Sequence, residues 1–279
     1  MSAIITLTTD FGLTDAYVAA MKGVILGINS EAKLIDICHT IKPQSIPQAA
    51  FVLGTTYQFF PRKTIHVAVV DPGVGTERRA IILRTPLADF VAPDNGVLSF
   101  VIQQSSTKLA EDKDNRQRVK LGTELEATII NKPQFWRSPV SATFHGRDIF
   151  APIAARLSLG FSPSDFGEAT DSVTMLPLSR PYQAPDGSLV GHILHIDNFG
   201  NLITNIKSDD LPRRKGTISI EVGNQLISSL SRTYAESSGL LALIGSSGYL
   251  EVSLKEGSAG AYLKAEVGDE VTVRRGGVS

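Results

Sequence analysis

Residues 3–29 have the sequence AIITLTTDFGLTDAYVAAMKGVILGIN. The first six residues are apolar or β-branched and predict a strand, and the next seven are polar and glycine-containing and predict the loop at its carboxyl end. The remainder predicts an amphipathic helix, because apolar residues recur at helical spacing at Val18, Met21, Ile25 and Ile28. A strand, a loop and a helix in this order are the building unit of parallel α/β sheets.

The same alternation continues through the first half of the chain. Further strands are predicted at 34–38, 64–70, 80–84 and 90–91, and further helices at 47–60, 96–103 and 148–159. This pattern predicts a Rossmann-like α/β/α domain with a largely parallel sheet, a buried Cys38 and an exposed excursion at 105–120. In such sheets, ligands bind beyond the carboxyl ends of the strands.

The pattern of the sequence changes near residue 170. A proline-rich segment, LPLSRPYQAPD at 176–186, is followed by short apolar runs separated by turn signals and without helical periodicity. The predicted strands are 189–196, 216–222, 225–227, 240–244, 249–252 and 270–273. We therefore predict an α/β domain over 1–170, a linker over 171–185 and a smaller antiparallel β-barrel domain over 186–279.

Composition restricts the classes of function. The chain has 279 residues, 42% of them hydrophobic, and a net charge of −1, which is typical of a globular protein with a substantial core. Nucleic acid is not an expected partner, because phosphate binding favours a basic excess. A membrane-spanning stretch and a signal peptide are not evident, and the single cysteine excludes an internal disulfide. We expect a cytoplasmic location.

Two loops at predicted strand ends carry paired charges. Asp10 and Asp15 flank the first loop, and a carboxylate there can accept hydrogen bonds from two hydroxyls at once. Asp71 begins the second loop, DPGVGTER, which ends at Arg78. The alternative readings are a turn with a helix cap for the first loop and a tight turn with a surface ion pair for the second.

Two further motifs contain polar or aromatic residues beside glycine. His145 lies within FHGRD at 144–148, at the predicted start of a helix, which is unusual for a buried structural histidine. DNFGN at 197–201 combines an aromatic ring with amides, a combination that suits stacking and hydrogen bonding to a base. An Asn/Gly turn is the alternative for the latter, and DNG at 94–96 is interpreted as a structural turn.

The spacing of these residues does not favour a metal site or a catalytic serine. No HxH, HExxH or calcium-loop pattern is present, and no GxSxG motif occurs. No metal and no cofactor is therefore expected.

In their order along the chain, these motifs resemble the S-adenosyl-L-methionine (SAM) hydroxide adenosyltransferases. The resemblance rests on TDFG at 9–12, DPGVGT at 71–76, FHGRD, DNFGN and SSGYLE at 246–251. It implies an adenosine-forming SAM hydrolase related to fluorinating and chlorinating enzymes. It also implies an α/β domain followed by a β-barrel, and a homotrimer that holds the ligand between the first domain of one subunit and the barrel of its neighbour.

The resemblance also implies roles for individual residues. Asp71, Arg78 and His145 match the catalytic set that separates the hydrolases from the halogenating relatives. The segment 84–89 leaves no room for the insertion of the fluorinating branch, and Ser247 stands where that branch has an arginine. Asp10 is expected at the ribose hydroxyls and Asp15 at the methionine amino group. The other expected substrate contacts are Phe144, Gly146, Asp197, Phe199, Asn201, Tyr234 and Ser246.

The resulting hypothesis is hydrolysis of SAM by water attack at C5′ of the ribose. Asp71 and His145 would orient and deprotonate the water, and which of them takes the proton is left open. The alternatives are a halogenase of the same family, a non-catalytic protein that binds SAM or adenosine, and a metal-dependent phosphoesterase.

Overall fold

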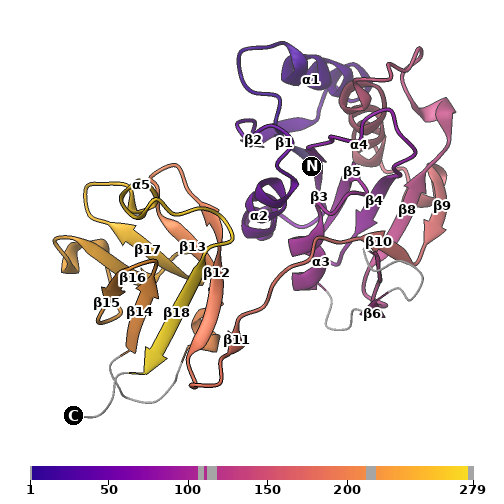
Figure 1. Cartoon of the computed structure of the whole chain (residues 1–279). Helices are drawn as coiled ribbons and strands as arrows, with labels where there is room; N and C mark the ends of the chain where they lie inside the picture. The colour runs from indigo at the N-terminus through magenta and orange to yellow at the C-terminus, as the bar shows by residue number, and fades with distance from the viewer. Residues whose placement is uncertain (1, 106–109, 112–117, 212–217, 276–279) are drawn as a thin grey trace. The chain divides into compact units, whose positions relative to one another are not determined.

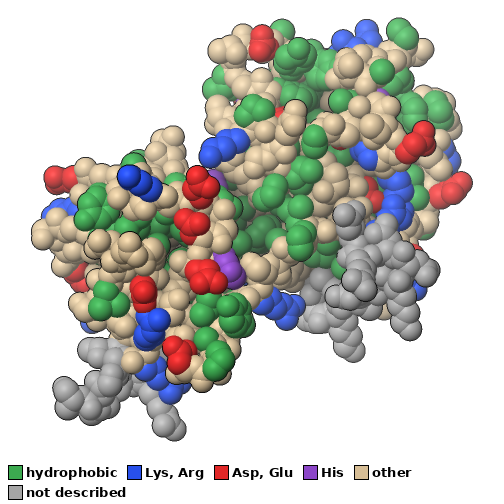
Figure 2. All heavy atoms as spheres, in the orientation of Figure 1, with side chains coloured by type: hydrophobic (Ala, Val, Ile, Leu, Met, Phe, Trp, Pro, Cys, Tyr) green, Lys and Arg blue, Asp and Glu red, His purple; other side chains and the backbone are tan. Residues whose placement is uncertain are grey.

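The computed structural model describes residues 2–105, 110–111, 118–211 and 218–275. The chain divides into two compact units, Met1–Pro177 and Leu178–Ser279 (Figure 1). The first is a mixed α/β unit and the second is built mainly of antiparallel strands. The predicted fold class is therefore confirmed. On the face shown in Figure 2, basic and acidic side chains are interspersed over both units.

A seven-stranded sheet forms the centre of the first unit, in the order β2-β1-β3-β5-β4-β8-β9. The first four strands are parallel, but β4, β8 and β9 join the sheet antiparallel. The prediction of a largely parallel sheet is therefore wrong for this half. Only residues 85–87 connect β4 to β5, whereas a parallel crossover needs a dozen residues or more. The strands are β1 (Ile4–Thr9), β2 (Lys33–Cys38), β3 (Thr64–Val69), β4 (Ala80–Arg84), β5 (Ala88–Pro93), β8 (Glu126–Ile130) and β9 (Gly167–Thr170).

Helices pack against this sheet in two pairs, one with each of the unit's two cores (Figure 1). One pair is α1 (Tyr17–Ile28) with α4 (Ala151–Ser158), and the other is α2 (Ile46–Thr56) with α3 (Ser99–Ser105). Neighbouring residues of β3 enter the two cores in turn, as a strand requires: Val67 packs with the first pair and Ala68 with the second. This arrangement places the loops that follow β1 and β3 at one edge of the sheet.

Two predictions about the first unit need correction or restriction. Cys38 ends β2, which is an edge strand, so its side chain is half-buried rather than buried. Of the predicted excursion at 105–120, residues 106–109 and 112–117 lie outside the described part of the chain. Its described parts form β6 (Ala110–Glu111) and β7 (Arg118–Lys120). In a small antiparallel sheet, β7 pairs with β6 on one side and with β10 (Ser172–Thr174) on the other.

His66 is a fully buried histidine in the centre of β3. Its Nδ1 lies 2.7 Å from the Thr6 hydroxyl oxygen on β1, and its ring stacks on Phe90 at 5.0 Å. Burial penalises the charged imidazolium and lowers the pKa of His66 to about 4. The folded protein therefore holds His66 neutral at pH values where the unfolded chain protonates it.

Acidification is expected to weaken the fold through His66. The contribution of its neutral form is complete above pH 6.5 and is lost as the pH falls toward about 4. Linkage gives a loss of about 2 kcal/mol between pH 7 and pH 5 from this one residue. Urea unfolding of the wild type and of His66→Phe at both pH values measures it. An equal pH dependence in the two proteins would contradict the assignment.

The second unit is a nearly closed antiparallel barrel in the order β15-β14-β18-β12-β13-β17-β16. A bridge between Leu230 and Ala242 brings the segment after β15 against β16, one edge of the sheet. Its apolar core includes Ile193, Leu250 and Val271. The strands are β12 (Leu189–Ile196), β13 (Leu202–Lys207), β14 (Ile218–Val222), β15 (Gln225–Ile227), β16 (Leu240–Ile244), β17 (Tyr249–Leu254) and β18 (Glu270–Arg275), with β11 (Tyr182–Gln183) paired to β12.

The sequence pattern does not predict β13 or the short helix α5 (Ala259–Leu263). Thr204 and Asn205 interrupt the apolar residues of 202–206 with polar side chains. Both are buried in β13 with hydrogen-bond partners, since the Thr204 hydroxyl donates to the Leu250 carbonyl at 2.9 Å and the Asn205 side chain accepts from the His192 amide at 2.8 Å. Among the residues described, no helix has the length and hydropathy required to cross a membrane.

Candidate active site

An ion pair closes the loop between β3 and β4. The Nε of Arg78 donates to both carboxylate oxygens of Asp71, at 2.9 and 3.0 Å, and its Nη2 donates to the same group. The side chains are 5% and 11% exposed for Asp71 and Arg78. A pair this buried retains its charges only with well-directed hydrogen bonds. The Asp71–Arg78 pair is therefore buried, and the alternative interpretation of this loop as a tight turn with a surface ion pair is wrong.

His145 extends this pair into a chain of three side chains. It lies at the start of a single π-helical turn, Gly146–Phe150, that leads into α4. The Nη2 of Arg78 lies 2.8 Å from the Nδ1 of His145. Because a guanidinium group can only donate, Nδ1 must be the unprotonated acceptor. Neutral His145 therefore carries its proton on Nε2.

The surroundings keep His145 neutral. Partial burial, followed by the positive charge of Arg78, lowers its pKa from 6.5, while Asp71 and Asp148 oppose this shift. Asp148 is itself fully buried and accepts hydrogen bonds from Arg147 and from the Ser141 amide at 2.8 Å. These contacts fix the segment that leads into and out of His145.

Gly75 permits the close approach of the two loops that carry this chain. It has a φ of +77°, and an added Cβ would lie 2.4 Å from the carbonyl oxygen of Ala142. The obstacle is backbone, so it cannot rotate away. A side chain at this position would push the loop of Asp71 and Arg78 away from the segment that leads to His145.

Gly75→Ala is expected to lower kcat roughly 10²-fold, because displacements of about 1 Å in a catalytic group have costs of this size. Gly187→Ala is the matched control, because Gly187 also has a positive φ, +80°, but nothing lies within 4 Å of its added Cβ. Steady-state kinetics of both variants tests the expectation. Equal kcat values for them would show that the contact with Ala142 is unimportant.

Asp71 and His145, the two ends of this hydrogen-bonded set, border a pocket of about 270 Å³ in the first unit. Asp10, at the end of β1, lies in its wall, and its Oδ2 accepts a hydrogen bond from the Gln44 amide at 2.7 Å. Gln44 has a φ of 65° and also lines the pocket. Gln44 is not predicted from the sequence, because no motif marks a residue that acts through its backbone. The pocket is lined by Asp10, Phe11, Gln44, Val69, Asp71, Pro72, Val74, Thr143, Phe144, His145 and Gly146.

Aromatic rings gather beside this pocket. Phe144 makes edge contacts with Phe11 at 5.7 Å and with Tyr17 at 5.2 Å, and the guanidinium of Arg147 lies 5.0 Å from its ring centre. Gly146 is buried against the same rings. Asp15 does not line the pocket; its side chain is exposed just before α1.

The remaining predicted residues lie on the barrel. Asp197 organises a turn, since its Oδ1 accepts hydrogen bonds from the amides of Phe199 and Asn201, both at 2.9 Å. The turn leaves the Phe199 ring 77% exposed. Ser246 is exposed in the turn between β16 and β17.

Tyr234 is half exposed and donates its hydroxyl proton to the buried carboxylate of Glu251 at 2.7 Å. This hydrogen bond is the largest cause that raises the pKa of Tyr234 to about 12, and the charge of Asp197 contributes. The Tyr234 ring is therefore a neutral aromatic surface near the Asp197 turn. Glu251, which holds the Tyr234 hydroxyl, is not predicted as a site residue from the sequence.

The two units define an α/β domain with a hydrogen-bonded Asp–Arg–His set beside a pocket, followed by a barrel with exposed aromatic rings. The sequence of the chain matches two family models. They are the SAM hydroxide adenosyltransferase N-terminal domain at residues 5–167 and the corresponding C-terminal domain at 191–272. The chain belongs to this family, as the resemblance of its motifs predicted.

Individual relatives agree with this assignment. A protein of Salinispora arenicola named (R)-S-adenosyl-L-methionine hydrolase is 36% identical, over 98% of this chain and 98% of that protein. A fluorinase of Nocardia brasiliensis is 26% identical over 98% and 97%. The crystal structure of an uncharacterized conserved protein from Thermotoga maritima superposes with a TM-score of 0.85 at 33% identity, covering 97% of this chain and all of that one.

Proposed function

We propose that the protein hydrolyses S-adenosyl-L-methionine to adenosine and L-methionine. The observation that carries this proposal is the hydrogen-bonded chain of Asp71, Arg78 and His145 beside the pocket. Membership of the family and the named hydrolases among the relatives support the same reaction.

The reaction is a substitution at C5′ of the ribose. The water oxygen bonds to C5′ while the C5′–S bond breaks, and the electron pair of that bond stays on sulfur. The sulfonium cation thereby becomes the neutral thioether of methionine, and the water proton passes to the protein. Because the substrate supplies a neutral leaving group, the protein has to align the water with C5′ and sulfur and remove one proton.

We assign proton removal to Asp71 and the orientation of the water to His145. The Nδ1 of His145 is occupied by Arg78, so its Nε2–H is available only to donate. The Oδ1 of Asp71 accepts one hydrogen bond from Arg78, among the described residues, whereas Oδ2 accepts two, so Oδ1 is the oxygen we assign to the water proton. A water that has begun to bond to C5′ is far more acidic than free water, so a carboxylate suffices as the base.

The expected binding roles fit the geometry of the first unit to different degrees. Asp10 keeps Oδ1 available for ribose hydroxyls, since the Gln44 amide occupies Oδ2. Phe144 and Gly146 would contact the substrate as part of the wall. We assign Asp15 to the methionine amino group through its charge, although it lies outside the described pocket.

The barrel residues would complete the site from a neighbouring subunit. We propose a homotrimer in which Asp197 and Ser246 bind the methionine end, Asn201 the adenine, and Phe199 and Tyr234 the faces of the base. The pocket of the first unit, about 270 Å³, is below the roughly 300–1,000 Å³ of typical ligand sites. Exposed aromatic rings on the barrel would supply the missing wall. Light scattering of the purified protein tests the oligomeric state.

Product analysis separates this proposal from its alternatives. Purified protein is incubated with SAM in chloride buffer, with and without EDTA, and the products are separated by chromatography. Adenosine and methionine in both buffers are the expected result. A 5′-haloadenosine would indicate a halogenase, binding without turnover would indicate a sensor, and loss of activity with EDTA would indicate metal-dependent chemistry.

The relatives' name also suggests a stereochemical preference. Since the similar proteins are named (R)-SAM hydrolases, we propose that the R epimer at sulfur is the preferred substrate. Separate assays with the two sulfonium epimers test this, and a higher kcat/KM for the S epimer would overturn it.

A further inference from the structure

The turn after β5, Asp94–Gly96, contacts both ends of the loop that carries Asp71 and Arg78. In sequence it has the composition of an ordinary turn. In the fold it follows the last residue of β5, between β3 and β4, the two strands that the loop joins. One turn is therefore placed to fix the start and the end of the same loop.

Asn95 holds the start of the loop. Its side-chain Nδ2 donates to the carbonyl oxygen of Val70 at 2.9 Å, and Val70 is the residue before Asp71. Its Oδ1 accepts from the Val97 amide at 3.2 Å, which orients the side chain. Val70 is fully buried, so its carbonyl depends on such a partner.

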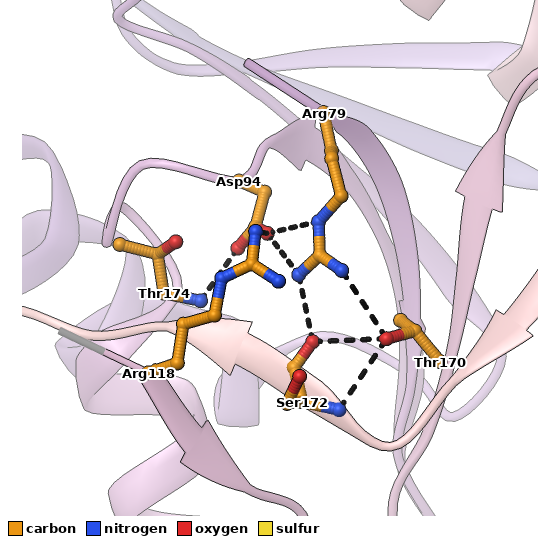
Figure 3. A network of polar contacts seen from close by, with 6 residues as sticks. All are labelled: Arg79, Asp94, Arg118, Thr170, Ser172 and Thr174. Carbon is orange, nitrogen blue, oxygen red and sulfur yellow. Dashed lines mark hydrogen bonds and ion pairs between the residues drawn. The ribbon is translucent and has the colours of Figure 1, made fainter. Parts of the chain in front are cut away.

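Asp94 holds the end of the loop through Arg79. The Asp94 amide donates to the Arg79 carbonyl at 2.9 Å, and the Arg79 Nε donates to Asp94 Oδ2 at 2.7 Å. The Asp94 side chain is 1% exposed, and its Oδ1 accepts from the Thr174 amide at 2.7 Å. Figure 3 shows Asp94 between Arg79 and Arg118, with Thr174 on the remaining side.

Arg79 has further contacts that fix its direction. It donates to the Thr170 hydroxyl at 3.2 Å and to the Ser172 carbonyl at 2.7 Å (Figure 3). The neighbouring Arg78 contacts Asp71 and His145 instead. Arg79 directly precedes β4 and Arg78 precedes Arg79, so anchoring Arg79 restrains the backbone that carries Arg78.

We propose that Asn95 and the Asp94–Arg79 pair are positioning residues for the hydrolytic reaction. They hold the two ends of the loop at the separation that lets Arg78 reach both Asp71 and the Nδ1 of His145. Arg79, Asp94 and Asn95 do not line the pocket. They therefore act on the water through the loop and not by touching substrate. This inference rests on the proposed function.

Asn95→Ala is the principal test, with Asn29→Ala as its matched control. Asn29 has the same local pattern, because its Nδ2 donates to the Ser158 hydroxyl at 2.8 Å and its Oδ1 accepts from the amide two residues later. It joins the end of α1 to α4, away from the catalytic loop. Both variants should lose similar stability, about 1 kcal/mol for the hydrogen bond.

The two variants should differ in kinetics. We expect Asn95→Ala to lower kcat by roughly 10²-fold with KM changed by less than about threefold, since the loop shifts Asp71 while Asp10, Phe144 and Gly146 line the pocket from other segments. Asn29→Ala should retain the wild-type kcat. Equal kcat values for the two variants at matched folded fraction would overturn the proposal.

A second variant and a double-mutant cycle make the test independent of one substitution. Arg79→Lys retains the charge but not the two-pronged contact with Asp94, and it should lower kcat in the same way as Asn95→Ala. In an Arg78→Ala background, Asn95→Ala should add almost nothing, because the group that it positions is gone. A full additional loss there would indicate a general structural role.

Nuclear magnetic resonance gives a readout that does not depend on activity. The ¹⁵N shifts of the His145 ring should report the Nε2–H tautomer in the wild type and in Asn29→Ala, and a mixture of tautomers in Asn95→Ala. A wild type that forms no adenosine would refute the proposed function, and the ring shifts would still decide the positioning role. An active wild type with unchanged kcat and ring shifts in Asn95→Ala would refute the positioning role alone.

Discussion

Replacing Arg78 with alanine is expected to lower kcat for adenosine formation by at least about 10³-fold, or about 4 kcal/mol of transition-state stabilisation. Arg78 is the only member of the catalytic chain that contacts the other two, at 2.9 Å to Asp71 and 2.8 Å to His145. Its loss leaves the Asp71 carboxylate, which is 5% exposed, without its counter-ion. An uncompensated buried charge of this kind costs about 3–5 kcal/mol, and protonation of Asp71 would remove the base.

Arg84→Ala is the control for this substitution. Arg84 makes a similar two-pronged pair with Asp89, with both distances at 2.8 Å, but its side chain is 40% exposed and it does not border the pocket. Its kcat should equal that of the wild type. Retention of more than a tenth of the wild-type kcat by Arg78→Ala would contradict the role given to Arg78.

Substitutions of His145 are expected to distinguish a hydrogen-bond donor from a base. His145→Ala should lower kcat by roughly 10²–10³-fold, as the loss of one positioned donor does in other sites. His145→Gln places an amide donor near the position of Nε2 and should retain about tenfold more activity than His145→Ala. If histidine takes the proton, glutamine cannot replace it. Equal kcat values for the two variants would therefore contradict the donor assignment.

The pH profile provides a second test of His145. Its pKa is lowered by burial and by Arg78, so the neutral form predominates above pH 6.5 and activity should be retained there. Protonation of Nδ1 removes the acceptor for Arg78 and breaks the hydrogen bond between Arg78 and His145. The value of kcat/KM should therefore fall on the acid side, with a midpoint below pH 6.5. A midpoint above 6.5 would show that the protonated form is stabilised, which contradicts the observed contact.

The catalytic loops could be predicted from the sequence because their signals are local. Asp71 follows an apolar strand and His145 precedes a glycine and a helix, and the resemblance to the family named both. Their mutual geometry could not be predicted. The hydrogen bond between Arg78 and His145 joins residues 67 positions apart, and it decides which nitrogen carries the proton.

Other features were hidden because their cause lies in tertiary contacts. Half of the sheet is antiparallel because only three residues connect β4 to β5. In sequence, these two strands resemble the strands of a parallel sheet. β13 was hidden by Thr204 and Asn205, which are polar but have buried partners. Asn95 was interpreted as a turn residue because its contact with Val70 depends on the neighbouring strand β3.

The source of the oxygen in the product tests the central claim most directly. Purified protein is incubated with SAM in H₂¹⁸O, and the products are analysed by mass spectrometry with fragmentation. Water attack at C5′ predicts adenosine with one ¹⁸O at the 5′ oxygen and methionine without label. Label in the methionine fragment, or a 5′ product without label, would contradict the attack of water at C5′ by the Asp71–Arg78–His145 site.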